Sequence, residues 1–196
     1  MESPSLMSYL SPHVHHKDLS FTQNRELSWL KFNERVLAHY LLGRALSDIG
    51  EAPAALQAYY DAIECADTTS SDCNYNTLIG VYGQMAQIFH KQNLPHDEIW
   101  AWQHYINYIS KTGNEEKTIV AKSQLIRPYY LLGEKDTVLQ IINDTYQCLK
   151  RLGKGQRAAS ILPSSIYIYI ERQNLTKAKE IMDVYEQESG LFDKNG

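Results

Sequence analysis

The sequence predicts an all-α protein, a right-handed α-solenoid of about four helix pairs with an extra N-terminal helix. Apolar residues recur at helical spacing through most of the 196 residues, and only 6 Pro and 10 Gly interrupt them. Short polar breaks divide this pattern at Gly50, Asn93, Gly133 and Gln173, which are 43, 40 and 40 residues apart. Even spacing of this length indicates stacked helix pairs, since each pair buries its apolar face against a neighbour.

The first pair turns at Gly50 and has the clearest pattern. Gly43 and Ala55 are small, so the two antiparallel helices can approach closely. Tyr59 and Ile63 lie one turn apart and predict the inner face of the second helix. Gly50 supplies the left-handed backbone conformation that ends the first helix.

Three further pairs follow the same plan. In the third and fourth, Pro128 and Pro163 fall inside the first helix, where each removes an amide donor and predicts a kink. The kinks are either a structural adjustment or a device that shapes a ligand groove. We expect the three pairs at 74–92 with 95–110, 115–132 with 135–152, and 156–172 with 175–189.

The offsets within the first pair match those of a known repeat, and residues 38–189 resemble the tetratricopeptide repeat family, in particular repeat proteins of the Bacteroides type. His39 stands where the family usually has Trp, and the period exceeds the usual length of about 34 residues, which implies longer helices. Such arrays often precede other modules, so we expect the chain to continue after Gly196. The match rests on Leu42-Gly43, Leu46, Gly50, Ala55-Leu56, Tyr59 and Ala62-Ile63.

The first 37 residues follow a different pattern. Residues 1–23 contain Ser, Pro and His without periodicity and predict a flexible leader. Its histidines, at 13, 15 and 16, could bind a metal, but no Cys lies near them, so no metal site is predicted there. Residues 24–37 predict an amphipathic helix. No Gly or Pro separates it from 38–49, so the two stretches should form one continuous helix.

The string NRELSWLKFNERVL at 24–37, together with residues 18–23, resembles the start of bacterial polyphosphate kinases. That family's phosphorylated His and phosphate-binding arginines lie in later domains that this sequence lacks, so no functional residue is carried over. Because the resemblance stops at Leu37-Ala38, the chain looks like a fusion of a kinase-like leader to a repeat domain at 38–196. If Trp29 and Phe32 stay exposed, they predict a homo-oligomer formed through the N-terminal helix.

Composition argues against several other classes of protein. The net charge is −4 without a basic run, so no nucleic-acid partner is expected. No apolar run reaches the ~18–20 residues of a membrane span, and no signal peptide is visible. We therefore expect no membrane insertion and a cytoplasmic location, with an exported parent that lost its leader as the alternative. Reduced thiols are expected at Cys65, Cys73 and Cys148, although a Cys65–Cys73 bridge stays open.

No catalytic signature stands out in the sequence. Gly153-Lys154-Gly155 lacks the spacing of a phosphate-binding loop and predicts a helix end. Zinc-protease and serine-hydrolase motifs are absent from the sequence. We therefore predict that the protein is not an enzyme and that it has no catalytic residue, cofactor or metal.

The first helix of each tetratricopeptide pair lines the concave face of the array, which predicts a partner-binding groove. Guanidinium groups and tyrosine edges suit extended peptides that carry carboxylates, although these residues could simply solvate the face. The Lys and Asn residues of the family's carboxylate clamp are not evident as a set. The predicted groove residues are Arg44, Gln87, Arg127 and Tyr167 at equivalent positions, with Tyr40, His90, Lys91 and Tyr130 near them.

The predicted function is a protein- or peptide-binding scaffold. One alternative is a non-catalytic fragment or regulatory piece of a polyphosphate kinase, which would bind nucleotide or polyphosphate. A second alternative is the sensory half of a larger regulator whose output module lies beyond Gly196.

Overall fold

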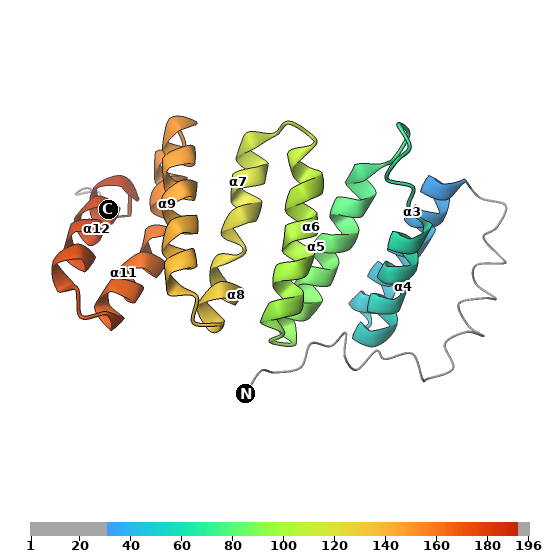
Figure 1. Ribbon diagram of the computed structural model, residues 1–196, viewed down its shortest axis with the longest axis horizontal. Coiled ribbons are helices and arrows are strands. Elements are labelled where there is room, and N and C mark those ends of the chain that lie inside the picture. The colour runs from blue at the N-terminus through green and yellow to red at the C-terminus, as the bar shows by residue number, and fades with distance from the viewer. Residues whose placement is uncertain (1–30, 192–196) are drawn as a thin grey trace. The chain divides into compact units, whose positions relative to one another are not determined.

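The computed structural model describes residues 31–191, and every regular element in that range is a helix (Figure 1). The predicted all-α class is confirmed for these residues. The chain divides into two compact units, residues 1–112 (unit 1) and 113–196 (unit 2). The expected leader at 1–23, and Trp29 within the expected helix at 24–37, lie outside the described residues. None of the described helices is both long and apolar enough to cross a bilayer.

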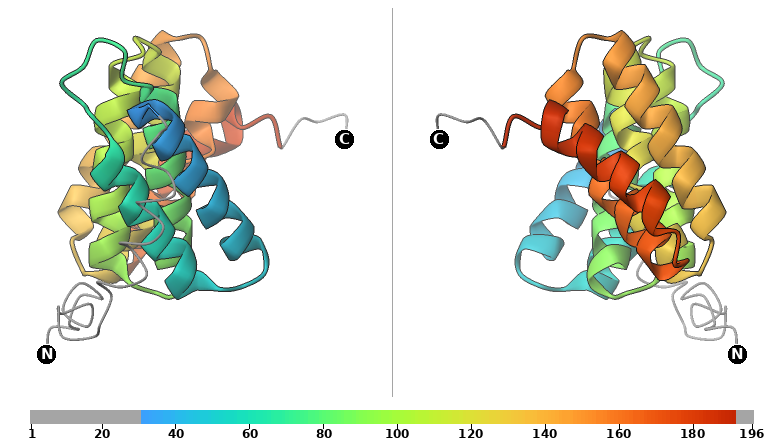
Figure 2. Two further views of the ribbon diagram at one scale, coloured as in Figure 1. Left: turned by 90° about the vertical axis from the view of Figure 1, so that its right-hand side faces the viewer. Right: turned by 90° about the vertical axis from the view of Figure 1, so that its left-hand side faces the viewer.

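Unit 1 contains two helix pairs. The first joins α3 (Phe32–Asp48) to α4 (Ala52–Cys65), and the second joins α5 (Tyr75–Lys91) to α6 (Pro95–Ser110). Both α3 and α4 also pack against α5, within the group of helices drawn from blue to green in Figure 2. One apolar core runs through all four helices. Its largest fully buried side chains include Tyr59, Leu78, Met85 and Phe89.

Helix α3 runs through the Leu37-Ala38 junction without interruption. It begins at Phe32, where the Glu34 carboxylate accepts the Lys31 backbone N–H at 2.9 Å. An acidic side chain in the first turn suits a helix N-terminus, because the unpaired N–H groups there carry partial positive charge. Phe32 is half-buried.

Two glycines let the helices of unit 1 approach closely. A Cβ added at Gly43 would lie 2.6 Å from Cδ1 of Tyr59, well inside contact distance, which confirms the predicted close approach of α3 and α4. Likewise, a Cβ added at Gly80 of α5 would lie 2.9 Å from the hydroxyl oxygen of Tyr40 on α3. The first pair therefore packs on the second through an aromatic ring placed over a bare backbone.

Unit 2 is built around α9 (Lys135–Arg151), which contacts α7 (Glu115–Ser123), α8 (Ile126–Leu131), α10 (Gly155–Ala159) and α11 (Leu162–Glu171). Helix α12 (Leu175–Glu188) packs on α11 and α10. Buried side chains from α9 and α11 form the centre of this core. They are Val138 and Ile142 of α9 with Leu162 and Ile168 of α11, while Leu149 of α9 packs in a separate cluster with Ile119 and Ala158.

The two prolines break their helices completely. We expected single kinked helices at 115–132 and 156–172, and this prediction is wrong, because each divides into two helices with a turn between them. Pro128 is the third residue of α8, and Pro163 is the second residue of α11. In a first helical turn the amide N–H has no intrahelical partner, so the missing donor costs nothing there. Breaking the helix before each proline therefore avoids a lost hydrogen bond.

All four polar breaks form the same turn. Gly50, Asn93, Gly133 and Gln173 have positive φ angles of 89°, 56°, 79° and 56°. In each turn, the next residue's N–H donates to the carbonyl five positions earlier, as from Glu51 to Leu46 at 2.9 Å and from Asn174 to Tyr169 at 2.9 Å. This is the Schellman helix ending. The predicted equivalence of the four breaks is confirmed in the backbone.

Replacing Gln173 with Gly should stabilise the protein. Gln173 holds a left-handed conformation that strains a residue with a Cβ, so Gln173→Gly should raise the free energy of unfolding by about 0.5–1 kcal/mol. Urea unfolding followed by circular dichroism measures the change. The matched control is Gly133→Gln, which should lower stability by a similar amount. Equal stability of Gln173→Gly and the parent would contradict the prediction.

A buried histidine lies between α3 and α4. His39 is buried, and neither of its ring nitrogens has a hydrogen-bond partner among the described residues. Its Nδ1 lies 3.9 Å from Oδ2 of Asp61, whose other oxygen accepts the Gln57 amide at 2.9 Å. Burial lowers the pKa of His39 from its ordinary value of 6.5, Asp61 opposes this shift, and Arg35 adds to it. His39 is therefore neutral in the folded protein at neutral pH.

This histidine should make stability depend on pH. Below pH 6.5, the ordinary pKa of histidine, the unfolded chain binds a proton at this position that the folded chain does not. The free energy of unfolding should therefore decrease as the pH is lowered from 6.5 to the lower pKa of His39 in the folded protein. Urea unfolding between about pH 7.5 and about pH 5 measures this loss. His39→Gln should show a smaller loss over the same range. An identical pH dependence in the two proteins would refute this assignment.

Candidate functional site

The predicted groove residues of unit 1 differ in their exposure. Arg44 on α3 and Gln87, His90 and Lys91 on α5 are exposed. Tyr40 is half-buried, because its ring covers Gly80 and lies 6.3 Å from the Tyr59 ring. Tyr40 therefore packs α3 against α5.

His90 also takes part in packing. Its Nδ1 lies 2.9 Å from Oε1 of Glu98, in the first turn of α6. The His90 side chain is 50 % exposed, whereas that of Glu98 is 2 % exposed. A buried carboxylate needs hydrogen-bond partners to offset its lost hydration, and His90 provides one.

In unit 2 the structure brings two predicted residues together. The ring centroids of Tyr130 on α8 and Tyr167 on α11 are 6.3 Å apart, in an edge-to-face arrangement. The Tyr130 hydroxyl donates to Glu171 at 2.9 Å, and Lys135 pairs with the same carboxylate at 2.9 Å. Both hydrogen bonds lower the pKa of Glu171, and the bond from Lys135 has the larger effect. Tyr130 is thus held in one orientation. Arg127 lies one turn before it on α8, half-buried.

The repeat spacing shows a difference between the two units. Each first helix presents three positions at i, i+3 and i+4, which share one helix face. In unit 1 these positions hold polar residues, as in Gln87, His90 and Lys91 of α5. In unit 2 they hold mostly apolar and aromatic residues. These six residues, which we name the α8–α11 face, are Arg127, Tyr130 and Leu131 on α8 and Tyr167, Ile170 and Glu171 on α11.

Three side chains of the α8–α11 face are large, apolar or aromatic, and exposed: Leu131 at 47 %, Tyr167 at 58 % and Ile170 at 49 %. Tyr167 was predicted from the sequence as a groove residue, whereas Leu131 and Ile170 were not. The available signal was their position, since both fall at the groove offsets of their repeats. Their apolar character made them look like core residues.

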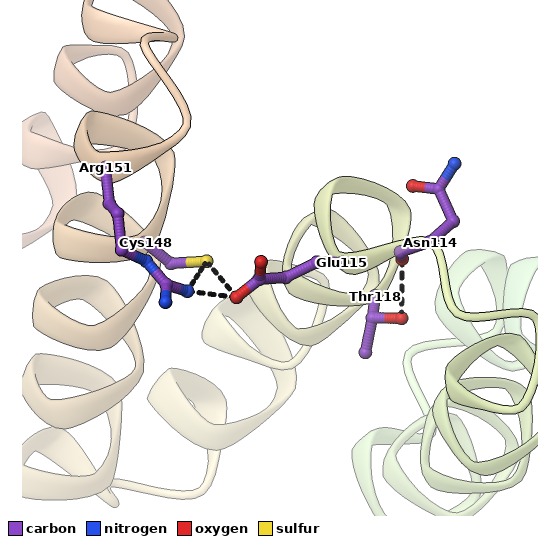
Figure 3. A network of polar contacts seen from close by, with 5 residues as sticks. All are labelled: Asn114, Glu115, Thr118, Cys148 and Arg151. Carbon is purple, nitrogen blue, oxygen red and sulfur yellow. Dashed lines mark hydrogen bonds and ion pairs between the residues drawn. The ribbon is translucent and has the colours of Figure 1, made fainter.

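Several ion pairs connect neighbouring helices of unit 2. Glu115 at the start of α7 accepts hydrogen bonds from Arg151 and from the Cys148 thiol of α9, while Thr118 bonds the Asn114 carbonyl oxygen at 2.9 Å (Figure 3). Arg172, which ends α11, pairs with Asp136 of α9 at 2.8 Å. Exposed pairs of this kind each add little stability.

Several tyrosines of unit 1 pack in an aromatic cluster between α5 and α6. The Tyr82 ring stacks on His104 at 4.7 Å and lies 5.6 Å from Trp100 and 5.7 Å from Tyr108. Burial lowers the pKa of His104 and raises that of Tyr82. Lys111 then covers the outer edge, 4.6 Å from the Tyr75 ring centroid. This cluster is packed ring against ring between α5 and α6.

Comparison with known proteins yields a similarity of fold. No protein-family model matches the chain, and no curated protein matches it in sequence. Among solved structures, BtubC (BKLC) from P. vanneervenii is similar, with a TM-score of 0.62 over 91 % of this chain and 71 % of that one. The two sequences are 16 % identical, so the similarity concerns the fold alone.

Removing His90 should destabilise unit 1. His90→Ala deletes a partner of the buried Glu98 carboxylate and should lower the free energy of unfolding by about 1–2 kcal/mol. Thermal or urea unfolding measures this loss. The control Lys91→Ala, at the neighbouring exposed position, should change stability far less. Equal effects of the two substitutions would show that the His90–Glu98 contact contributes nothing.

Proposed function

We propose that this protein is a tetratricopeptide-like helical-repeat scaffold that binds a protein or peptide through the α8–α11 face. The observation that carries the proposal is the exposure of Leu131, Tyr167 and Ile170 at the repeat positions that face the groove in such arrays. The Schellman turns at the four polar breaks, spaced 43, 40 and 40 residues apart, support the repeat assignment. The similarity of fold to BtubC is compatible with it.

An exposed cluster of this composition suits protein recognition. Tyrosine is enriched in interfaces because its ring buries a large apolar area while its hydroxyl keeps a hydrogen bond. Tyr130 shows both features, because its ring packs against the ring of Tyr167 and its hydroxyl donates a hydrogen bond to Glu171. A side chain that is ordered before binding loses little conformational entropy when the partner arrives.

The residues around the apolar side chains define the chemistry of the partner. Leu131, Tyr167 and Ile170 would contact apolar side chains, and burying them would release water from their surfaces. Arg127 adds a cation on the same face of α8, which suits a carboxylate of the partner. The occupant we propose is therefore a peptide segment that carries apolar side chains and at least one acidic group.

Paired surface variants test this function. The intact chain is used as bait in a bacterial lysate, beside Tyr167→Ser/Ile170→Ser, and each captured partner is identified and then titrated in pure form. The double variant should bind a genuine partner with an affinity about tenfold or more lower than that of the parent, because central aromatic and aliphatic contacts dominate interface energies.

The matched control is Leu175→Ser/Met182→Ser, which removes two exposed apolar residues from α12. It should bind like the parent chain. A partner that binds all three proteins equally, or that both double variants lose equally, would reject the α8–α11 face as the binding site.

A further inference from the structure

A second feature of unit 2 lies outside the α8–α11 face. A cavity of about 600 Å³ opens at the turn between α9 and α10. Its lining comes from Lys150 near the end of α9, from residues 153–157 and from Glu188 of α12. This volume falls within the range of small-molecule sites, about 300–1,000 Å³.

Positive charge dominates the lining. Three of its residues are cationic, Lys150, Lys154 and Arg157, against one carboxylate, Glu188. Lys150 pairs with Glu188 at 2.7 Å, and that carboxylate also accepts the Tyr146 hydroxyl at 2.8 Å.

Lys154 and Arg157 must share a single carboxylate. Glu116 of α7 lies 2.7 Å from Nη1 of Arg157 but 3.7 Å from Nζ of Lys154. The cavity and its partners therefore hold one more cation than carboxylate, and Lys154 is the least compensated. All of these pairs reach solvent, so exchanging a carboxylate for another anion costs little.

Gly155 provides an independent argument. Gly153 has a φ of +72°, which explains why that position is glycine. Gly155 has no such angle, and a Cβ added there would meet no atom within 4 Å. Neither backbone conformation nor packing requires a glycine at this position. Close approach of a ligand to the backbone is one of the uses of glycine, and the open space beside Gly155 permits it.

We propose that this cavity binds the di- or triphosphate group of a small molecule. Lys150 and Lys154 supply compact positive charges, and the planar Arg157 guanidinium can bind two phosphate oxygens at once. The Gln156 amide lines the same cavity and adds neutral donors. Bare backbone at Gly153 and Gly155 leaves room for the phosphates beside Lys154. Side chains form this site, since the segment lacks the spacing of a phosphate-binding loop.

The test is a titration of the full-length, isotope-labelled chain with sodium tripolyphosphate, followed by nuclear magnetic resonance. Saturable shifts should appear at the amides of Gly153, Gly155 and Gln156. Lys154→Gln/Arg157→Gln should weaken binding by about tenfold or more, as expected for lost charge-assisted hydrogen bonds. Gly155→Ala should also weaken it while leaving the unfolding temperature unchanged or higher, because Ala favours the helix and meets no neighbour.

Lys177→Gln is the matched control. Lys177 is 49 % exposed, the same as Lys154, and pairs with Glu180 at 2.8 Å on α12 of the same unit. This variant should bind tripolyphosphate like the parent. Shifts that never saturate, or equal losses in Lys177→Gln and Lys154→Gln/Arg157→Gln, would overturn the proposal by showing diffuse attraction to any cation.

A parallel titration with ATP distinguishes a site for an inorganic phosphate chain from a site for a nucleotide. Equal affinity for ATP and tripolyphosphate would show that the site recognises the phosphate chain alone, and tighter ATP binding would show that it also contacts the nucleoside. Binding to neither would overturn the proposal. These results are separate from partner capture, because no residue of the α8–α11 face lines the cavity.

Discussion

Each helix pair of this protein reverses direction through one residue that must adopt a left-handed backbone conformation. At Gly50, Asn93, Gly133 and Gln173 the positive φ lets the next amide reach back five residues and satisfy a carbonyl at the helix end. The second helix then starts within a few residues and folds back along the first. Pairing, core formation and the exposed helix faces all depend on this reversal, because a helix of this length is marginal without a partner to cover its apolar side.

The helices of the two units pack together in different ways. In unit 1 long unbroken helices come together where glycine meets tyrosine, Gly43 against Tyr59 and Gly80 against Tyr40. In unit 2 the first helices are broken before Pro128 and Pro163, so short segments pack against α9, the longest helix described in this unit. Shorter segments bury fewer apolar residues each, and a larger share of the contacts between helices is ionic, as in Arg172 with Asp136.

The repeat positions that face the proposed groove carry different kinds of side chain in the two units. At the repeat positions that face the proposed groove, unit 1 has polar side chains, and His90 is held there by the buried Glu98. The same positions in unit 2 expose Leu131, Tyr167 and Ile170, with Tyr130 fixed beside them. The cations near the α9–α10 turn form a second, chemically distinct surface in the same unit. One helical framework thus carries an apolar face and a basic cavity on different elements.

The sequence alone determined the features that depend on local interactions. The four turns, the helix pairs and the close approach at Gly43 could be predicted because their causes lie within a few residues or one repeat. Burial could not be predicted in the same way. In the run Ile166-Tyr167-Ile168-Tyr169-Ile170, Ile168 is fully buried while Ile170 is half exposed, although the two side chains are identical. The packing role of His90 and the cavity beside Lys154 were likewise decided by tertiary structure. The reason is physical, since a turn is closed by hydrogen bonds between near neighbours, whereas exposure depends on which distant helix covers each face.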